Sequence, residues 1–92
     1  MSARVILTSA PTAATVERSR ALLVFAALTA AGHQSIAQGD VELTAAARRA
    51  EALVAGWIYD VRYARPVEER TARMIAAALD LAGIACRVEV LS

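Results

Sequence analysis

The sequence predicts an α+β fold of the ferredoxin-like, split βαβ kind. Strand-like segments lie near both ends of the chain, at 3–9 and 85–91, and a third lies at 57–63. Helical patterns separate these strands. The segment 16–32 also aligns with 67–83, so that each half of the chain resembles one strand–helix–strand unit.

The first half begins with the apolar, β-branched strand 3–9, which Pro11 follows. A helix is expected over 12–31, where no proline or glycine intervenes before Gly32. From Ala21 onward this helix is apolar almost all round, which predicts burial on more than one side. A weakly patterned segment, 34–38, is expected to form an edge strand, where poor patterning is tolerable.

The stretch 57–63 is expected to be a central strand beside 3–9. Its residues favour strands, it alternates, and Gly56 and Pro66 bound it. In the alternative, the helix predicted over 43–55 continues through this stretch. That reading has a helical apolar spacing too, but it requires Gly56 inside a helix at a cost of about 1 kcal/mol. We therefore favour the strand.

A further helix is expected over 66–82. Pro66 suits its first turn, Glu68 and Glu69 complement its positive end, and Gly83 follows its last periodic residue. The final segment is expected to be a strand, because Cys86, Val88 and Val90 alternate with Arg87, Glu89 and Leu91. The helix 43–55 becomes an insertion between the two halves. The predicted product is a single domain over 1–92, with an antiparallel sheet that helices cover on one face.

Composition excludes several classes of function. Ten basic residues against nine acidic ones leave a net charge of +1, so no general field attracts nucleic acid or anionic membranes. The apolar run 21–31 is too short to span a bilayer, which needs about 20 residues. Cys86 is the only cysteine, which excludes an internal disulfide and favours a reducing, cytoplasmic location.

No catalytic residue, cofactor or metal site is predicted. His33 is the only histidine, and no nearby acid is spaced to act as its partner. One histidine and one cysteine cannot assemble a four-ligand zinc site with the usual spacing. The glycines are scattered, so no phosphate loop exists. Cys86 is expected to be a small buried apolar residue on one face of the last strand.

The aromatic and arginine residues of the stretch GWIYDVRYARP are the clearest candidates for ligand contacts. If exposed, the rings could stack nucleic-acid bases, with an arginine near phosphate. If the rings pack beneath the helices instead, the stretch belongs to the core. The balanced charge favours packing and makes nucleic acid an alternative partner only. The residues concerned are Trp57, Tyr59, Arg62, Tyr63 and Arg65.

The expected function is that of a non-catalytic assembly module, which self-associates or binds a protein partner. The basis is an excess of apolar surface for so small a core. The expected interface residues are Leu22, Phe25 and Leu28 of the first helix, and Ile6, Ile58 and Leu91 of the open sheet face. The alternatives are a nucleic-acid-binding domain and a small cofactor-free enzyme with a cavity between sheet and helices. For such an enzyme the candidates are Tyr59, Tyr63, His33 and Asp60.

Overall fold

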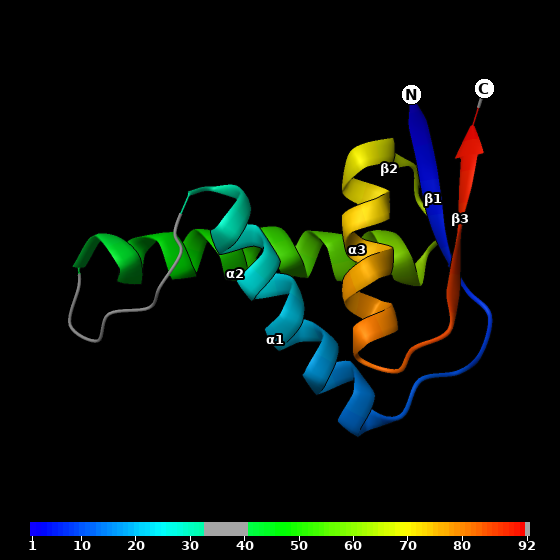
Figure 1. The fold of residues 1–92 in the computed structure, drawn as a ribbon, viewed down its shortest axis with the longest axis horizontal. Helices are drawn as coiled ribbons and strands as arrows, with labels where there is room; N and C mark the ends of the chain where they lie inside the picture. The colour runs from blue at the N-terminus through cyan, green and yellow to red at the C-terminus, as the bar shows by residue number, and fades with distance from the viewer. Residues whose placement is uncertain (33–40, 92) are drawn as a thin grey trace.

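The computed structural model describes residues 1–32 and 41–91, and the side chains of its second helix from Ala45 onward. The elements in these ranges are β1 (Ser2–Leu7), α1 (Ala13–Ala30), α2 (Val41–Arg62), β2 (Val67–Glu68), α3 (Glu69–Leu81) and β3 (Cys86–Leu91) (Figure 1). They confirm the α+β class. None of the described helices combines the length and the apolar character needed to cross a membrane.

The sheet has the order β2-β1-β3, and both pairings are antiparallel. β1 pairs with β3 along its whole length, from Ser2 opposite Leu91 to Leu7 opposite Cys86. The much shorter β2 pairs only with Ser2 and Ala3. The central first strand and the last strand at an edge agree with the sequence prediction.

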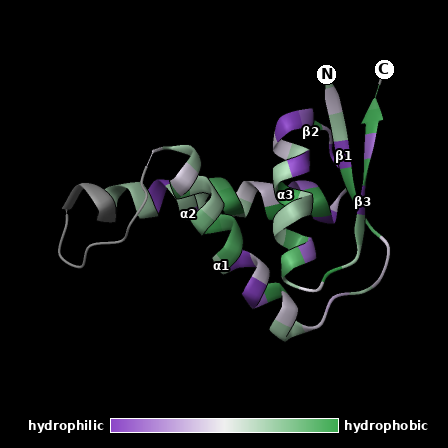
Figure 2. Cartoon of the chain, in the orientation of Figure 1, coloured by the Kyte–Doolittle hydropathy of each residue, from purple (hydrophilic) through white to green (hydrophobic). Residues whose placement is uncertain are grey.

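The two faces of the sheet differ because residues directly opposite one another share a face. On one face Ala3 and Val5 of β1 are buried. The three helices lie on this side of the sheet, whereas the other face is open (Figure 1). Figure 2 shows the matching alternation of hydrophilic and hydrophobic residues along the strands. The open face carries Arg4 opposite Glu89 and Ile6 opposite Arg87.

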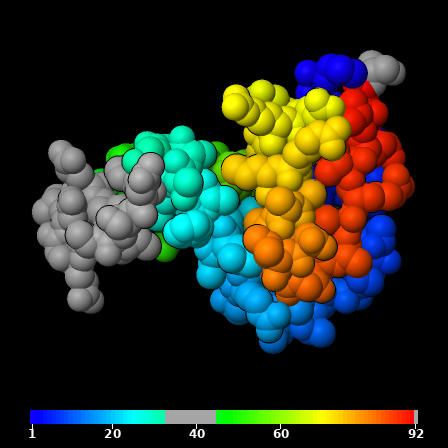
Figure 3. Space-filling model, viewed as in Figure 1, coloured from blue at the N-terminus to red at the C-terminus, as the bar shows by residue number. Residues whose placement is uncertain are grey.

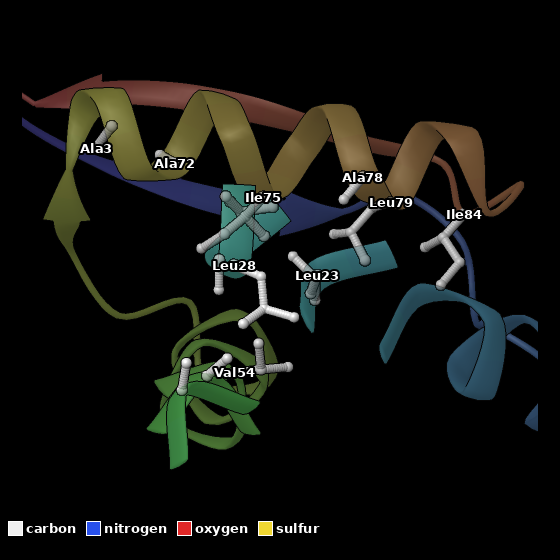
Figure 4. Packing of buried hydrophobic residues seen from close by; sticks show 13 residues of the cluster. Ala3, Leu23, Leu28, Val54, Ala72, Ile75, Ala78, Leu79 and Ile84 are labelled. Carbon is white, nitrogen blue, oxygen red and sulfur yellow. The ribbon is translucent and has the colours of Figure 1, made fainter. Parts of the chain in front are cut away.

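The hydrophobic core lies between the sheet and the helices. Its largest fully buried side chains are Leu23 of α1, Val54 of α2 and Ile75 of α3 (Figure 4). α1 contacts both α2 and α3, so it is buried on two sides. The apolar circumference of α1 had predicted this position, which is confirmed.

The predicted central strand at 57–63 is wrong, because α2 continues unbroken to Arg62. Val54 is buried, and Trp57 and Val61 pack against the core from the same side of this helix. Gly56 lies on the exposed side, with nothing near its Cα that a side chain would meet. Burial of the inner side therefore outweighs the helical cost of one glycine.

Because this helix is continuous, the predicted strand 57–63 of the ferredoxin-like arrangement is missing. The ferredoxin-like arrangement is therefore not confirmed, and neither is the strand–helix–strand repeat. The other strand expected in the middle of the chain, 34–38, lies outside the described residues. The predicted helix 66–82 begins three residues late, at Glu69. The reason is that Val67 and Glu68 pair with β1, and the Glu69 N–H donates to the Met1 carbonyl over 2.8 Å.

The helices end in the same way. At the end of α3, the Ile84 N–H donates to the Leu79 carbonyl over 2.9 Å, and Gly83 adopts a left-handed conformation with φ 83°. This is a Schellman motif, which glycine accommodates without strain. Gly32 has φ 93° at the corresponding place after α1. Both glycines had predicted helix ends, and both predictions are confirmed.

Candidate functional site

The outer edge of β3 is the longer of the two edges of the sheet, because β3 has six residues and β2 has two. β3 is the last strand in the sheet order, and none of the described residues pairs with its outer side. Figure 3 shows β3 running along one side of the molecule. The strand has six residues in one regular register, Cys86–Leu91, without a bulge, proline or glycine.

The hydrogen-bond pattern determines which groups of β3 point outward. The Thr8 N–H donates to the Ala85 carbonyl over 3.0 Å, so these two residues form a hydrogen-bonded pair that extends the register of β1 and β3. Hydrogen-bonded pairs alternate with non-hydrogen-bonded ones along an antiparallel ladder. Arg87, Glu89 and Leu91 therefore direct their backbone groups toward β1.

The intervening residues, Cys86, Val88 and Val90, direct their N–H and C=O groups toward the free edge. The pairing of β1 with β2 agrees with this alternation of backbone directions. There Met1 is bonded to Glu69, so the odd-numbered residues of β1 face β2 and the even-numbered ones face β3.

Two opposite charges of β3 project from the open face, close to its free edge. Glu89 forms ion pairs with Arg4 over 3.6 Å and with Arg87 over 3.5 Å. All three side chains are more than a third exposed, so these pairs contribute little to stability. The Arg4 Nε is buried and has no hydrogen-bond partner among the described residues.

The covered side of the same edge is apolar. Val90 is 40% exposed although its side chain lies on the helix-covered face. Cys86 is half-buried, and its Sγ donates to the Ala76 carbonyl over 3.8 Å. Burial raises the pKa of the Cys86 thiol, and the nearby Asp80 carboxylate raises it further. The thiol is therefore a weak nucleophile at neutral pH.

The structure separates the six predicted interface residues. Ile6 and Leu91 do lie on the open face of the sheet. Phe25 is 59% exposed on α1, and Leu22 packs against the core. Two expectations are wrong. Leu28 is buried because α1 crosses between two helices, and Ile58 belongs to α2 rather than to the sheet.

The aromatic and arginine residues do gather at the C-terminal end of α2. Tyr59 and Tyr63 are exposed and their ring centroids lie 4.7 Å apart, tilted by 52°. Arg62 lies over the Tyr63 ring at 5.6 Å, and Arg65 over the Tyr59 ring at 5.5 Å. Trp57 packs against the core. The expectation that all three rings are packed is therefore wrong for the two tyrosines. They lie one helical turn apart, on the side of α2 that faces away from the core.

A hollow of about 390 Å³ opens between α1, the end of α2 and the end of β1. Its lining is mainly apolar, with Leu23, Ile58 and Val61 among the contributors and Arg62 as the one charged residue. The Ser19 hydroxyl in this lining donates to the Val16 carbonyl over 2.7 Å. Because the lining holds no carboxylate or histidine, it offers no pair of groups for acid–base chemistry.

Of the residues suggested for an enzyme, Tyr59 and Tyr63 lie side by side at the end of α2. Asp60 forms an ion pair with Arg65, and His33 lies outside the described residues. Within ranges 1–32 and 41–91, no three His, Cys, Asp or Glu side chains are close enough to hold a metal ion.

Searches of protein-family models, of curated proteins and of solved structures find no match to this chain. The fold and the surface define it instead as a small α+β protein with a three-stranded antiparallel sheet. In the described residues, helices cover one face of that sheet, and its other face and the β3 edge are accessible.

The sequence had predicted that Arg87 and Glu89 lie in a strand and that charges of the open sheet face could meet in a symmetric pair, but not that they lie at a free edge. Their alternation with Val88 and Val90 gave the faces of the strand. The neighbours of β3 are set by pairing between segments that are distant in the sequence. This pairing places β1 on one side of β3 and none of the described residues on the other. Local periodicity carries no signal for that pairing.

Proposed function

We propose that this protein is a non-catalytic assembly module that self-associates through the free edge of β3. The observation that carries the proposal is the row of outward N–H and C=O groups at Cys86, Val88 and Val90. Such a row is a template for another strand. Proteins that avoid edge pairing commonly use bulges, prolines, inward-pointing charges or exposed charges on the edge strand. Of these, β3 has only the exposed charges Arg87 and Glu89, which are of opposite sign and can therefore pair between two copies.

The size of the edge sets the expected strength. Interfaces that bury less than roughly 1,200 Å² are characteristic of weak or transient complexes. A six-residue strand with its flanking side chains belongs to this range. We therefore expect a dissociation constant on the order of micromolar rather than nanomolar.

Sedimentation velocity between roughly 1 and 300 µM tests the proposal, since this range brackets a micromolar equilibrium. We expect the mass to rise above the 9.7 kDa monomer. The variant Val90→Pro removes an N–H that points away from β1, so it blocks the edge but keeps the ladder to β1. It should stay monomeric with an unchanged circular dichroism spectrum.

Phe25→Ser is the matched control, because it removes the exposed ring of α1 and leaves β3 intact. It should associate like the wild type. A wild-type protein that remains monomeric at the highest concentration contradicts the proposal. Association that Phe25→Ser abolishes and Val90→Pro preserves would move the interface to α1.

A second candidate function, binding of single-stranded nucleic acid, is favoured by the exposed pair of Tyr59 and Tyr63 beside Arg62 and Arg65. Aromatic rings and arginines together can stack bases and contact phosphate. The net charge of +1 opposes it. Assembly therefore remains the favoured function.

Titration of labelled single-stranded RNA at about 50 mM salt, where phosphate contacts are strong, distinguishes the two functions. An assembly module should bind no more tightly than the nonspecific level. Sub-micromolar binding that is lost in Tyr59→Ala and Tyr63→Ala, but kept in Phe25→Ala, would establish the second function.

A further inference from the structure

We infer that the strand added to β3 is β3 of a second copy, antiparallel and centred on Val88, so that Arg87 of each copy faces Glu89 of the other. This inference rests on the proposed function and specifies its partner and its register. Each copy then offers the same surface to the other, as a two-fold dimer requires.

The backbone restricts the possible registers. Only outward-facing residues can exchange hydrogen bonds with the added strand, and these are Cys86, Val88 and Val90. A two-fold antiparallel pair that uses at least two of them on each strand has three possible centres. These centres are Arg87, Val88 and Glu89.

Charge selects one of these three registers. A pair centred on Arg87 sets Arg87 directly opposite the partner's Arg87, and a pair centred on Glu89 sets the two glutamates opposite each other. A pair centred on Val88 sets Arg87 opposite the partner's Glu89, and does so twice. These are non-hydrogen-bonded positions, where Cα atoms approach to about 4.5 Å and like charges are destabilising.

The Val88 register also suits the remaining side chains. On the open face, Glu89 lies between Arg4 of its own chain and the partner's Arg87, so charges alternate across the joined sheet. On the covered face, Val88 meets the partner's Val88, and the exposed Val90 meets the partner's Cys86. Every outward backbone group of the three residues gains a partner.

Charge reversal tests the register. Arg87→Glu gives a strand with two acidic side chains, and Glu89→Arg gives one with two basic side chains. Each variant alone should dimerise at least about tenfold more weakly than the wild type, because two attractive pairs become repulsive. An equimolar mixture should form a heterodimer about as tight as the wild-type dimer. The double variant R87E/E89R should again form a homodimer.

Arg48→Glu is the matched control, because it reverses an exposed arginine in the N-terminal half of α2, which Figure 1 shows on the side of the molecule away from β3. It should leave dimerisation unchanged. Recovery in the mixture cannot come from repaired folding, since each chain keeps its own substitution. Thermal unfolding of each variant at low concentration measures any folding defect separately.

The outcomes distinguish the two levels of the proposal. If the wild type dimerises and Val90→Pro is monomeric, but charge reversal changes nothing, the Val88 register is wrong and the proposed function stands. If the wild type is monomeric throughout, both are wrong. If each single variant weakens association and the mixture restores it, the register is established.

Discussion

The Arg65 N–H donates to the Asp60 carbonyl over 2.8 Å, and the side chains of the same two residues form an ion pair over 3.9 Å. Between them, the Ala64 N–H donates to the Val61 carbonyl over 3.2 Å. These bonds form the Schellman motif that ends α2. At its left-handed position this motif has Ala64, with φ 49°, where α1 and α3 have glycine.

Replacing Ala64 with glycine should therefore stabilise the protein. A residue other than glycine in the left-handed region costs roughly 1–2 kcal/mol of stability. Glycine removes this cost, but its greater conformational freedom in the unfolded chain offsets part of the gain. We expect Ala64→Gly to raise the free energy of unfolding by about 0.5–1 kcal/mol. Urea denaturation measures the change. Ala77→Gly, inside α3, should act in the opposite direction.

The reverse substitution should stabilise the middle of α2. Gly56 is exposed, and a Cβ added there would meet nothing within 4 Å. Gly56→Ala should raise the free energy of unfolding by about 1 kcal/mol, the helix-propensity difference between the two residues. Urea denaturation of this variant is also a direct test of the helix. A loss of stability would mean that the segment is not helical in solution.

The start of α1 depends on a reciprocal capping box. The Thr12 hydroxyl accepts from the Thr15 N–H over 3.2 Å, and the Thr15 hydroxyl accepts from the Thr12 N–H over 2.9 Å. We expect Thr12→Ala to lower the free energy of unfolding by about 1 kcal/mol. Thermal unfolding measures the loss. Thr29→Ala, near the other end of α1, is the control and should change stability by no more than about 0.5 kcal/mol.

Two leucines of α3 should differ sharply in their contribution to the core. Leu79 is 5% exposed, whereas Leu81 is 74% exposed. Leu79→Ala should cost about 2–5 kcal/mol, and Leu81→Ala about 0.5 kcal/mol or less. Chemical denaturation compares them. If Leu79→Ala does not fold, the milder Ile75→Val tests the same core, with an expected loss of about 0.5–1.5 kcal/mol.

Stability should fall in alkaline solution because of Cys86. Burial raises the pKa of this thiol in the folded protein, so the unfolded chain loses the proton first. The folded state then holds more protons than the unfolded one, and the free energy of unfolding decreases as pH rises above about 8.5. Cys86→Ala should show a smaller decrease. Denaturation curves of both proteins between about pH 7 and pH 10 give the comparison.

The sequence predicted those elements whose signals are local. Gly32 and Gly83 identified the ends of α1 and α3, and the alternation of Arg87, Val88 and Glu89 identified β3. The end of α2 was not predicted, because Ala64 occupies the left-handed position at which a glycine would have indicated a helix end. Gly56 instead suggested a break at a place where the helix continues.

The candidate site was predictable only in part. Ile6 and Leu91 follow from strand alternation, and Leu28 could not be removed from the interface without knowing that α2 and α3 both pack on α1. The exposure of Tyr59 and Tyr63 could not be predicted, because it depends on the segment 57–63 being helical, whereas its composition favours a strand. In each case the missing information was tertiary packing.

The pairing of β1 with β3 also has a consequence for the order of folding. It joins residues 2–7 to residues 86–91, so this ladder cannot form during synthesis until almost the whole described chain has left the ribosome. The helical segments can associate earlier, because their contacts lie closer together along the chain. Until the last strand arrives, β1 has an unpaired backbone on the side that β3 will occupy, and this backbone is open to non-native strand pairing during that interval.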